Sequence, residues 1–319
     1  MKKRVTLVDI AKRTGVSVNC VSRALMDASD ISDSTKSKIK KVADELGYVP
    51  NLSAASLKKG NSKIVGILYD NLLNTYYNTV IYYLHQILSE KNYSVITYRA
   101  DEFDEAIYKE MISRNLEGLI SFLTPNDDLA KKIHANHFPT VIIGRKSDYL
   151  SSVCYDDNKV GYLAGKALLD MGYQNPVYLG EVETLDISRK RAEGFIEALK
   201  EKNILGKVIF RKFINEPRLE LLNRALTGDE VDSIFCFSDH MAFWVMRELL
   251  SKNLSAIKVI GVDNIQQEIP LPFSLTTIGQ DKNKMALDTI GLLFNQIEQK
   301  EMGVELIIED VYLVDNPIS

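Results

Sequence analysis

Three side chains near the N-terminus have the types and spacing to read a DNA sequence. Asn19, Cys20 and Arg23 fall in the first turns of a short predicted helix whose N-cap is Ser17. Amide and guanidinium groups donate hydrogen bonds to base edges in the major groove, so these residues are candidate base readers. Cys20 could equally be a small residue that fills the helix surface. The chemistry expected here is therefore base recognition.

A helix-turn-helix pattern would position these readers. We expect one helix after Thr6, a second over about 18–26 and a third between Ser32 and Gly47, because apolar residues recur at helical spacing in each segment. In a helix-turn-helix the second helix lies in the major groove and presents its first residues to the bases. Val18 belongs to that turn as well, although it could be packing instead.

Hydroxyl groups at the helix starts are candidate contacts to phosphate. Thr6, Ser17, Ser22 and Ser32 stand at or near predicted N-termini, where backbone N–H groups and hydroxyls can face a phosphate. Such contacts would position the protein on the duplex without specifying a sequence. The same residues can also act only as helix caps.

The charge of the chain is divided unevenly. Residues 1–63 hold 13 Lys and Arg against 6 Asp and Glu, a net charge of +7, although the whole chain of 319 residues has a net charge of −4. The remainder is therefore strongly acidic, at −11. A basic N-terminal segment suits binding to a phosphate backbone, which an acidic body does not. The length predicts roughly two to three domains.

Several functional classes are disfavoured. Polar residues from Thr6 onward interrupt the apolar stretch that a signal peptide needs, and no segment approaches the ~20 apolar residues that span a bilayer. The cysteines and histidines lack metal-site spacing, and the sequence has no nucleophile elbow, P-loop or dinucleotide-binding glycine motif. We therefore expect a cytoplasmic protein that is not an enzyme and has no cofactor and no metal.

Short apolar runs alternate with amphipathic stretches from Lys63 onward. Predicted buried strands, rich in Ile, Val and aromatic residues, lie at 63–70, 94–99, 118–123, 139–144, 176–181, 207–213, 233–238 and 257–263. Predicted helices between them include 76–91, 159–171, 189–202 and 241–252. This alternation predicts an α/β fold of two lobes, each a doubly wound parallel sheet, with ligands outside the carboxyl ends of the strands.

The runs VTLVDIAKRTGVSVNCVSRALMD, ELGYVPN and NLSAASLKKG resemble the lactose/galactose repressor (LacI/GalR) family, and the resemblance extends through the rest of the chain. It implies a three-helix head and a two-lobed core like that of periplasmic binding proteins. It also implies that Asn51 begins a hinge helix, that Ala54 packs against the dimer mate and that Leu57 wedges into the minor groove. Leu7 and Tyr48 complete the expected DNA contacts.

Two departures from the family pattern matter for DNA recognition. Ala55 stands where many members have an arginine, and Met26 stands where most have an asparagine. Ala55 removes a possible minor-groove contact, and Met26 weakens the case for a contact to the DNA backbone, so an operator sequence cannot be transferred from relatives.

The resemblance further implies an effector cleft between the lobes. Tyr76 and Tyr77 occupy the position of an aromatic cleft residue, and Arg191 occupies that of an arginine that clamps the effector. Asp239 and Asp263 each follow a predicted strand and match the family's acidic cleft positions. Carboxylates and a guanidinium can hold paired hydroxyls. One tyrosine could instead pack inside, and Asp239 could only cap its helix.

Two more residues are weaker candidates for the cleft. Arg145 follows the predicted strand at 139–144, and Phe213 aligns loosely with a stacking aromatic residue. Core or surface roles are equally open for both. Asp157 and Asn158 match a strand-to-helix pair that could serve as a lobe hinge or a cap.

The resulting hypothesis is a sequence-specific transcriptional regulator. We expect a helix-turn-helix domain over 1–50, a hinge helix and linker over 51–62 and an effector-binding, dimerising core over 63–319. Its N-lobe would comprise 63–156 and 288–319, and its C-lobe 157–287. The predicted protein is a homodimer on a palindromic operator, and we expect it to repress carbohydrate utilisation in response to a small sugar or sugar phosphate. One alternative is the same architecture with a purine or nucleoside effector, or with a role in corepression or global regulation. The others are a stand-alone sugar receptor and a sugar enzyme tethered to DNA.

Overall fold

A computed structural model describes residues 5–49, 62–227, 230–269, 274–299 and 303–315 of the chain. The chain divides into two compact units, residues 1–62 and 63–319, here called the head and the body. The described part of the head is helical, whereas the body is built from two sheets with helices packed on them.

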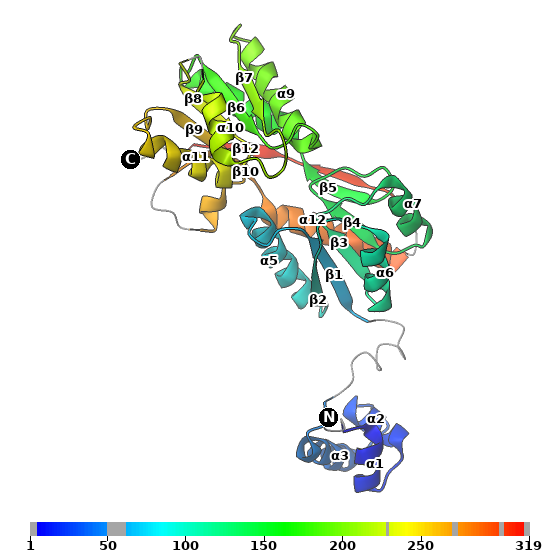
Figure 1. Ribbon diagram of the computed structural model, residues 1–319. Coiled ribbons are helices and arrows are strands. Elements are labelled where there is room, and N and C mark those ends of the chain that lie inside the picture. The colour runs from blue at the N-terminus through cyan, green and yellow to red at the C-terminus, as the bar shows by residue number, and fades with distance from the viewer. Residues whose placement is uncertain (1–4, 50–61, 228–229, 270–273, 300–302, 316–319) are drawn as a thin grey trace. The chain divides into compact units, whose positions relative to one another are not determined.

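The head contains the three predicted helices, which are α1 (Leu7–Thr14), α2 (Val18–Leu25) and α3 (Asp33–Leu46) (Figure 1). Caps define their ends: Gly15 and Gly47 adopt φ angles of 76° and 66°, a left-handed conformation that glycine accepts most easily. The three helices pack around one small core. Its fully buried members include Ile10, Val21 and Ile39, one from each helix.

The first sheet of the body is entirely parallel and has the strand order β11-β5-β4-β3-β1-β2. Its strands are β1 (Ile64–Tyr69), β2 (Ser94–Arg99), β3 (Gly118–Ser121), β4 (Thr140–Ile143), β5 (Ser151–Tyr155) and β11 (Leu306–Glu309). Its helices are α5 (Thr75–Glu90), α6 (Glu105–Ser113), α7 (Asp127–Ala135) and α12 (Lys282–Gln299). This sheet and these helices form the first lobe.

The second sheet has the order β12-β10-β9-β8-β6-β7 and is parallel except for β12. Its strands are β6 (Pro176–Gly180), β7 (Lys207–Phe210), β8 (Ser233–Cys236), β9 (Lys258–Val262), β10 (Thr276–Gln280) and β12 (Val311–Val314). Its helices are α8 (Asp157–Asp170), α9 (Asp186–Lys200), α10 (Arg218–Ala225), α11 (Asp239–Ser251) and the 3-10 turn η1 (Ile265–Gln267). Together they form the second lobe.

Each sheet is covered by helices on both faces, as the alternation of strand side chains requires (Figure 1). On β1, Ile67 packs in the core beside α5 and α12, while its neighbour Leu68 packs beside α6 and α7. On β6, Tyr178 packs beside α8 and α9, while Leu179 packs beside α10 and α11. The doubly wound architecture predicted from the sequence is confirmed.

The chain passes between the lobes three times, and the last crossing corrects the expected lobe boundaries. It crosses from β5 to α8, from β10 to α12 and from β11 to β12. The assignment of all of residues 288–319 to the first lobe is wrong, because Val311–Val314 pairs antiparallel with β10 of the second sheet. The segment 304–314 contains two strands, which Asp310 separates. Residues 282–287, which the expected boundary assigned to the C-lobe, are the start of α12, a helix of the first lobe.

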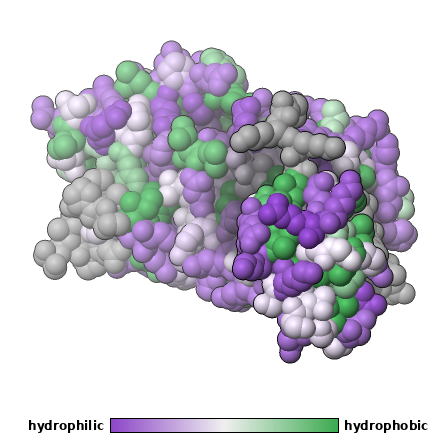
Figure 2. Space-filling model, turned by 90° about the horizontal axis from the view of Figure 1, so that it is seen from below, coloured by the Kyte–Doolittle hydropathy of each residue, from purple (hydrophilic) through white to green (hydrophobic). Residues whose placement is uncertain are grey.

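Among the described residues, no helix is both long enough and apolar enough to cross a membrane. The face seen in Figure 2 is mainly hydrophilic or neutral, and apolar residues appear on it in small scattered groups. A folded protein exposes such groups routinely.

Candidate functional site

The exposed face of α2 carries the candidate base readers. Asn19 and Arg23 are exposed, and Val18 retains 41% of its accessible surface. Arg23 forms an ion pair with Asp30, with 2.6 Å between Nη2 and Oδ1. Both partners are half exposed, so the guanidinium can exchange this carboxylate for a base or a phosphate at small cost. Direct base contact by these residues stays a prediction.

Three other predicted DNA contacts face the head's interior. Cys20, Leu7 and Tyr48 are half-buried and pack against the head core. For Cys20 the position favours the simpler alternative, a small residue that fills the helix surface, because its side chain contributes to packing. Only the remaining exposed part of each side chain is available for contact with DNA.

The predicted phosphate-binding hydroxyls take part in helix caps. Thr6 donates from its backbone N–H and its hydroxyl to Asp9 Oδ2, at 2.9 and 2.7 Å. Ser17 Oγ accepts from the N–H of Cys20 at 3.2 Å, and Ser32 Oγ accepts from that of Thr35 at 3.4 Å. Ser22 lies half-buried within α2. The predicted hinge residues Asn51, Ala54 and Leu57 lie outside the described residues.

In the body, a buried arginine lies where the effector-clamping residue was predicted. Arg191 on α9 is 6% exposed, and its Nε donates to Asp157 Oδ1 at 2.9 Å. Its Nη1 donates to the carbonyl oxygen of Phe237 at 2.5 Å, and its guanidinium lies 4.7 Å from the centre of that residue's ring. Nη2 has no hydrogen-bond partner among the described residues. Burial raises the pKa of Asp157, although Arg191 opposes the shift.

Two glycines bring Arg191 and Asp157 together by letting α8 and α9 approach closely. A Cβ on Gly161 of α8 would lie 1.9 Å from the carbonyl oxygen of Arg191. A Cβ on Gly194 of α9 would lie 1.9 Å from that of Asn158. Such distances are far inside van der Waals contact, so neither position admits a side chain without separating the helices.

Asp263, directly after β9, sits on a strained backbone. Its φ angle is 108°, a region that residues other than glycine rarely adopt, and Asn264 follows at 49°. The fully buried Lys282 holds this turn by donating from Nζ to the carbonyl oxygen of Asp263 at 2.6 Å. The carboxylate of Asp263 is half-buried and forms no hydrogen bond among the described residues. Its pKa is raised by burial, while Arg191 and Lys282 act to lower it.

Asp239 occupies a different environment from the predicted one. It is completely buried, its Oδ2 accepts from the N–H of Ile265 at 2.9 Å, and its Oδ1 accepts from the hydroxyl of Thr277 at 2.6 Å. Gly261 makes room for this carboxylate, because a Cβ there would lie 2.1 Å from Oδ1. Asp239 therefore joins α11, η1 and β10, and its position argues against direct contact with a ligand.

The first lobe contributes the two predicted tyrosines at the start of α5. The Tyr76 ring packs edge-on against Tyr155, with 6.3 Å between ring centres, and the Tyr77 ring lies 4.6 Å from that of Phe122. Burial raises the pKa of Tyr76, and Asp263 of the second lobe raises it further. Burial likewise raises the pKa of Tyr77 to about 12, with Asp70 and Arg145 nearby. The charge of Asp263 in the second lobe therefore acts on Tyr76 in the first lobe.

Two predicted effector residues, Arg145 and Phe213, are exposed, whereas two residues that the sequence analysis did not name have buried side-chain oxygens. Arg145 is exposed after β4, and Phe213 is 55% exposed in the loop after β7. Asp70 and Thr124, which come after β1 and β3, have buried side-chain oxygens, Oδ1 and Oγ1, that find no hydrogen-bond partner in the described parts of the chain. Unpaired buried acceptors at strand ends are typical of ligand sites. Ligands of parallel sheets bind outside the carboxyl ends of the strands, and this rule would have identified Asp70, which directly follows β1.

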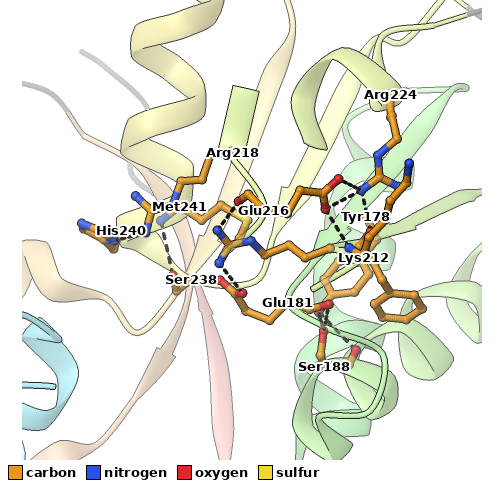
Figure 3. Close-up of polar contacts among 12 residues, drawn as sticks. Tyr178, Glu181, Ser188, Lys212, Glu216, Arg218, Arg224, Ser238, His240 and Met241 are labelled. Atoms are coloured by element: carbon orange, nitrogen blue, oxygen red, sulfur yellow. Dashed lines mark hydrogen bonds and ion pairs between the residues drawn. The ribbon is translucent and has the colours of Figure 1, made fainter. Parts of the chain in front are cut away.

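A second set of polar residues that the sequence did not single out lies at the strand ends of the second lobe (Figure 3). We call it the strand-end arginine cluster, and its members are Glu181, Arg211, Glu216, Arg218, Arg224 and His240. Ion pairs and hydrogen bonds join α10, α11 and the segments after β6 and β7. No group of His, Cys, Asp and Glu in the described parts of the chain has the arrangement of a metal site.

Two family models match the chain. Residues 6–51 match "Bacterial regulatory proteins, lacI family", and residues 62–303 match "Periplasmic binding proteins and sugar binding domain of LacI family". The first match covers the described head helices. The second covers more than half of the chain, including every predicted effector residue.

Curated relatives and solved structures agree with these matches. The chain is 28% identical to the HTH-type transcriptional regulator MalR of Clostridium butyricum over 92% of its own length and 93% of the relative's. It is 26% identical to the HTH-type transcriptional repressor PurR of Vibrio vulnificus, over 96% and 98%. The lac repressor dimer bound to operator and an anti-inducer has a TM-score of 0.81 at 21% identity, covering 98% of both chains. A CelR–cellobiose complex has a TM-score of 0.67 at 21% identity, covering 98% and 99%.

Proposed function

The chain belongs to the LacI family of bacterial regulatory proteins, and from that premise we propose that it represses a carbohydrate-utilisation operon under the control of a small sugar or sugar phosphate. The head would recognise operator DNA, and the body would bind the effector between its lobes. The observation that carries the effector assignment is that Nη2 of Arg191 and the carboxylate of Asp263, whose charges interact, form no hydrogen bond among the described residues.

Arg191 and Asp263 supply complementary hydrogen-bonding groups. Asp157 and the carbonyl of Phe237 fix the guanidinium through Nε and Nη1, which leaves Nη2 to donate to a ligand. The carboxylate of Asp263 can accept from a neighbouring ligand hydroxyl. A donor beside an acceptor matches two adjacent hydroxyls of a sugar, each of which both donates and accepts. The strained backbone of Asp263 further favours a functional role, since such strain concentrates at binding sites.

Contact with both lobes would couple binding to a change of shape. Tyr76, Tyr77 and Arg145 belong to the first lobe, whereas Arg191 and Asp263 belong to the second. A ligand held by both sets favours the lobe arrangement in which all contacts are made, and it shifts the population only by its difference in affinity for the two arrangements. We infer that this shift changes the spacing of the hinge segments in a homodimer.

On the DNA side, the dimer would place two heads on adjacent half-sites of a palindromic operator. Asn19 and Arg23 of each head would read bases, and Leu57 of each hinge would insert into the minor groove near the operator's centre. We further propose that the protein works in the cytoplasm as a regulator without catalytic activity, in keeping with relatives that are named regulators and repressors.

A purine or nucleoside effector is the second candidate. The similarity to PurR of Vibrio vulnificus, at 26% identity over nearly the full length, supports it. The aromatic rings of Tyr76 and Tyr77 at the start of α5 would suit stacking on a base. A ligand screen that includes adenine, guanine and hypoxanthine beside sugars separates the two candidates.

The function is tested by selecting duplexes from a random pool with the full chain, followed by measurement of operator affinity. We expect one enriched palindromic sequence, and we expect Leu57→Gly to lose the preference for it while retaining salt-sensitive binding to any duplex. Met26→Ala is the matched control, since Met26 lies on the head and is not proposed to contact bases. Selection of no sequence would contradict the proposed function, and an unchanged preference in Leu57→Gly would contradict the wedge.

A further inference from the structure

The strand-end arginine cluster lies on the ligand-binding edge of the second sheet. Glu181 directly follows β6 and Arg211 directly follows β7, while His240 is the second residue of α11, after β8. β8, β6 and β7 are consecutive neighbours in the sheet, and β9, which ends before Asp263, lies on the other side of β8. The cluster therefore continues the row of polar residues that begins at Asp263.

Two of the three arginines in the cluster have a carboxylate partner. Arg211 Nη1 lies 2.9 Å from Glu181 Oε2, and Arg224 Nη2 lies 2.8 Å from Glu216 Oε2. Both glutamates are thereby engaged, and Glu216 is almost completely buried. The cluster holds three guanidinium groups against two carboxylates, so one positive charge is left over.

The surplus charge belongs to Arg218. Among the described residues it forms no ion pair with a carboxylate, and its one hydrogen bond is to His240, with 3.2 Å between Nη2 and Nδ1. Figure 3 shows Arg218 and His240 together on one side of the cluster, with Glu216 and Arg224 on the other side and Glu181 between them. Burial and the neighbouring Arg211 lower the pKa of Arg218, and Glu181 opposes this shift only in part, so the guanidinium has a desolvation cost that a bound anion would offset.

His240 adds a second hydrogen-bond donor at the same place. A guanidinium can only donate, so Nδ1 of His240 must accept, and the imidazole is then neutral with its proton on Nε2. Burial lowers the pKa of His240, and the adjacent Arg218 lowers it further, which favours this neutral form at pH 7. Arg218 and His240 therefore both present N–H groups, and between them they carry one positive charge.

We propose that Arg218 and His240 bind the phosphate of a phosphorylated sugar whose hydroxyls contact Arg191 and Asp263. This inference rests on the proposed function and deepens it by naming the effector class. His240 follows β8, which is the neighbour of β9 in the sheet, and neighbouring strands are about 4.8 Å apart, so His240 and its partner Arg218 lie next to Asp263 along this edge. The phosphate belongs at the Arg218 end, because the carboxylate of Asp263 would repel it at the other.

The test compares matched pairs of sugars by isothermal titration calorimetry on the full chain. The pairs are glucose and glucose 6-phosphate, fructose and fructose 6-phosphate, and ribose and ribose 5-phosphate, with maltose and cellobiose as neutral disaccharides. We expect one phosphorylated sugar to bind at least tenfold more tightly than its unphosphorylated partner and than either disaccharide. Arg218→Gln should abolish this tenfold advantage, about 1.4 kcal/mol, without changing the affinity for the neutral partner.

Two further variants keep the result decisive. His240→Gln should also reduce the difference in affinity between the phosphorylated sugar and its unphosphorylated partner. It replaces Arg218→Gln as the test if that variant does not fold. Arg247→Gln is the matched control, because Arg247 lies on α11 with a side chain that is 70% exposed and pairs with Glu248. It should keep the full advantage.

Three outcomes would overturn the inference: a neutral sugar that binds more tightly than every phosphorylated one, an advantage that survives in both Arg218→Gln and His240→Gln, or no binding of any phosphorylated sugar. None of them would contradict the proposed function as long as the protein selects a DNA sequence. Failure of that selection, by contrast, contradicts the proposed function itself.

Discussion

Replacing Asp263 with glycine should stabilise the protein while removing its response to the effector. A non-glycine residue in a sparsely populated region of backbone conformation costs ~1–3 kcal/mol, and the φ angle of Asp263 is 108°. Glycine adopts that angle freely but loses ~0.5–1 kcal/mol more through its greater freedom in the unfolded chain. These backbone contributions leave about 1 kcal/mol in favour of Asp263→Gly.

The charge of Asp263 makes the gain depend on pH. Burial raises the pKa of this carboxyl above its ordinary value of 3.8, so the folded protein binds a proton more tightly than the unfolded chain does. The wild-type protein therefore loses stability as pH rises from about 4 through the raised pKa, and Asp263→Gly does not. We expect the advantage of the variant to be larger at pH 8 than at pH 5.

Urea unfolding can follow this effect in the second lobe, because the single tryptophan, Trp244, lies on α11 and packs against that lobe's core. Asp263→Asn removes the charge but keeps a side chain. Its stability relative to the wild-type protein should therefore rise with pH, as for Asp263→Gly, but without the stabilisation that comes from relieving the backbone strain. Asn253→Gly, at a φ angle of 58° in the turn after α11, is the matched control, since asparagine tolerates that angle. A lower free energy of unfolding for Asp263→Gly at every pH would refute the strain argument.

Three more substitutions test the site and the head. Arg191→Met leaves Asp157 buried without its partner and should lower the free energy of unfolding by about 3–5 kcal/mol. The loss should be larger at pH 8 than at pH 5, because the already raised pKa of Asp157 rises further when Arg191 is removed. Equal losses at the two pH values in urea titrations would count against this prediction. Gly194→Ala should cost at least ~1–3 kcal/mol, whereas Gly291→Ala, with no atom within 4 Å of the added Cβ, should be neutral or better in thermal melts. Arg23→Ala should weaken binding to the selected duplex by about 1–3 kcal/mol at fixed salt, with less effect on random duplex; a uniform loss on both would make Arg23 a phosphate contact.

Periodicity was sufficient to predict the strands whose residues are apolar, but not those with buried polar side chains. β5 and β10 were missed because their sequences, SSVCY and TTIGQ, are rich in serine and threonine. The structure satisfies these groups: Ser152 Oγ donates to the carbonyl of Leu150, and Thr277 donates to Asp239. Such partners come from the tertiary fold and leave no local pattern.

The predicted helices began late for a related reason. α8 and α9 start at Asp157 and Asp186, whereas the apolar pattern suggested 159 and 189. First turns are often polar, because acidic residues there interact favourably with free N–H groups, and so they lie outside the apolar period.

Family resemblance identified Arg191 and Asp263, yet it could not say how each is held. The burial of Asp239 between Ile265 and Thr277 depends on the packing of three elements. The pairing of Arg218 with His240 joins residues 22 positions apart, on two helices whose sequences carry no motif. Geometry of this kind becomes visible only when the strand order is known.

The most direct test of a DNA-binding head controlled by a ligand in the body is the dissociation constant for the selected duplex, measured at fixed salt with and without the ligand that the screen identifies. We predict binding at least ~10³-fold tighter than to a scrambled duplex, and a change of about 5- to 150-fold when the ligand is added. Equal affinity for the two duplexes, unchanged by the ligand, would contradict it.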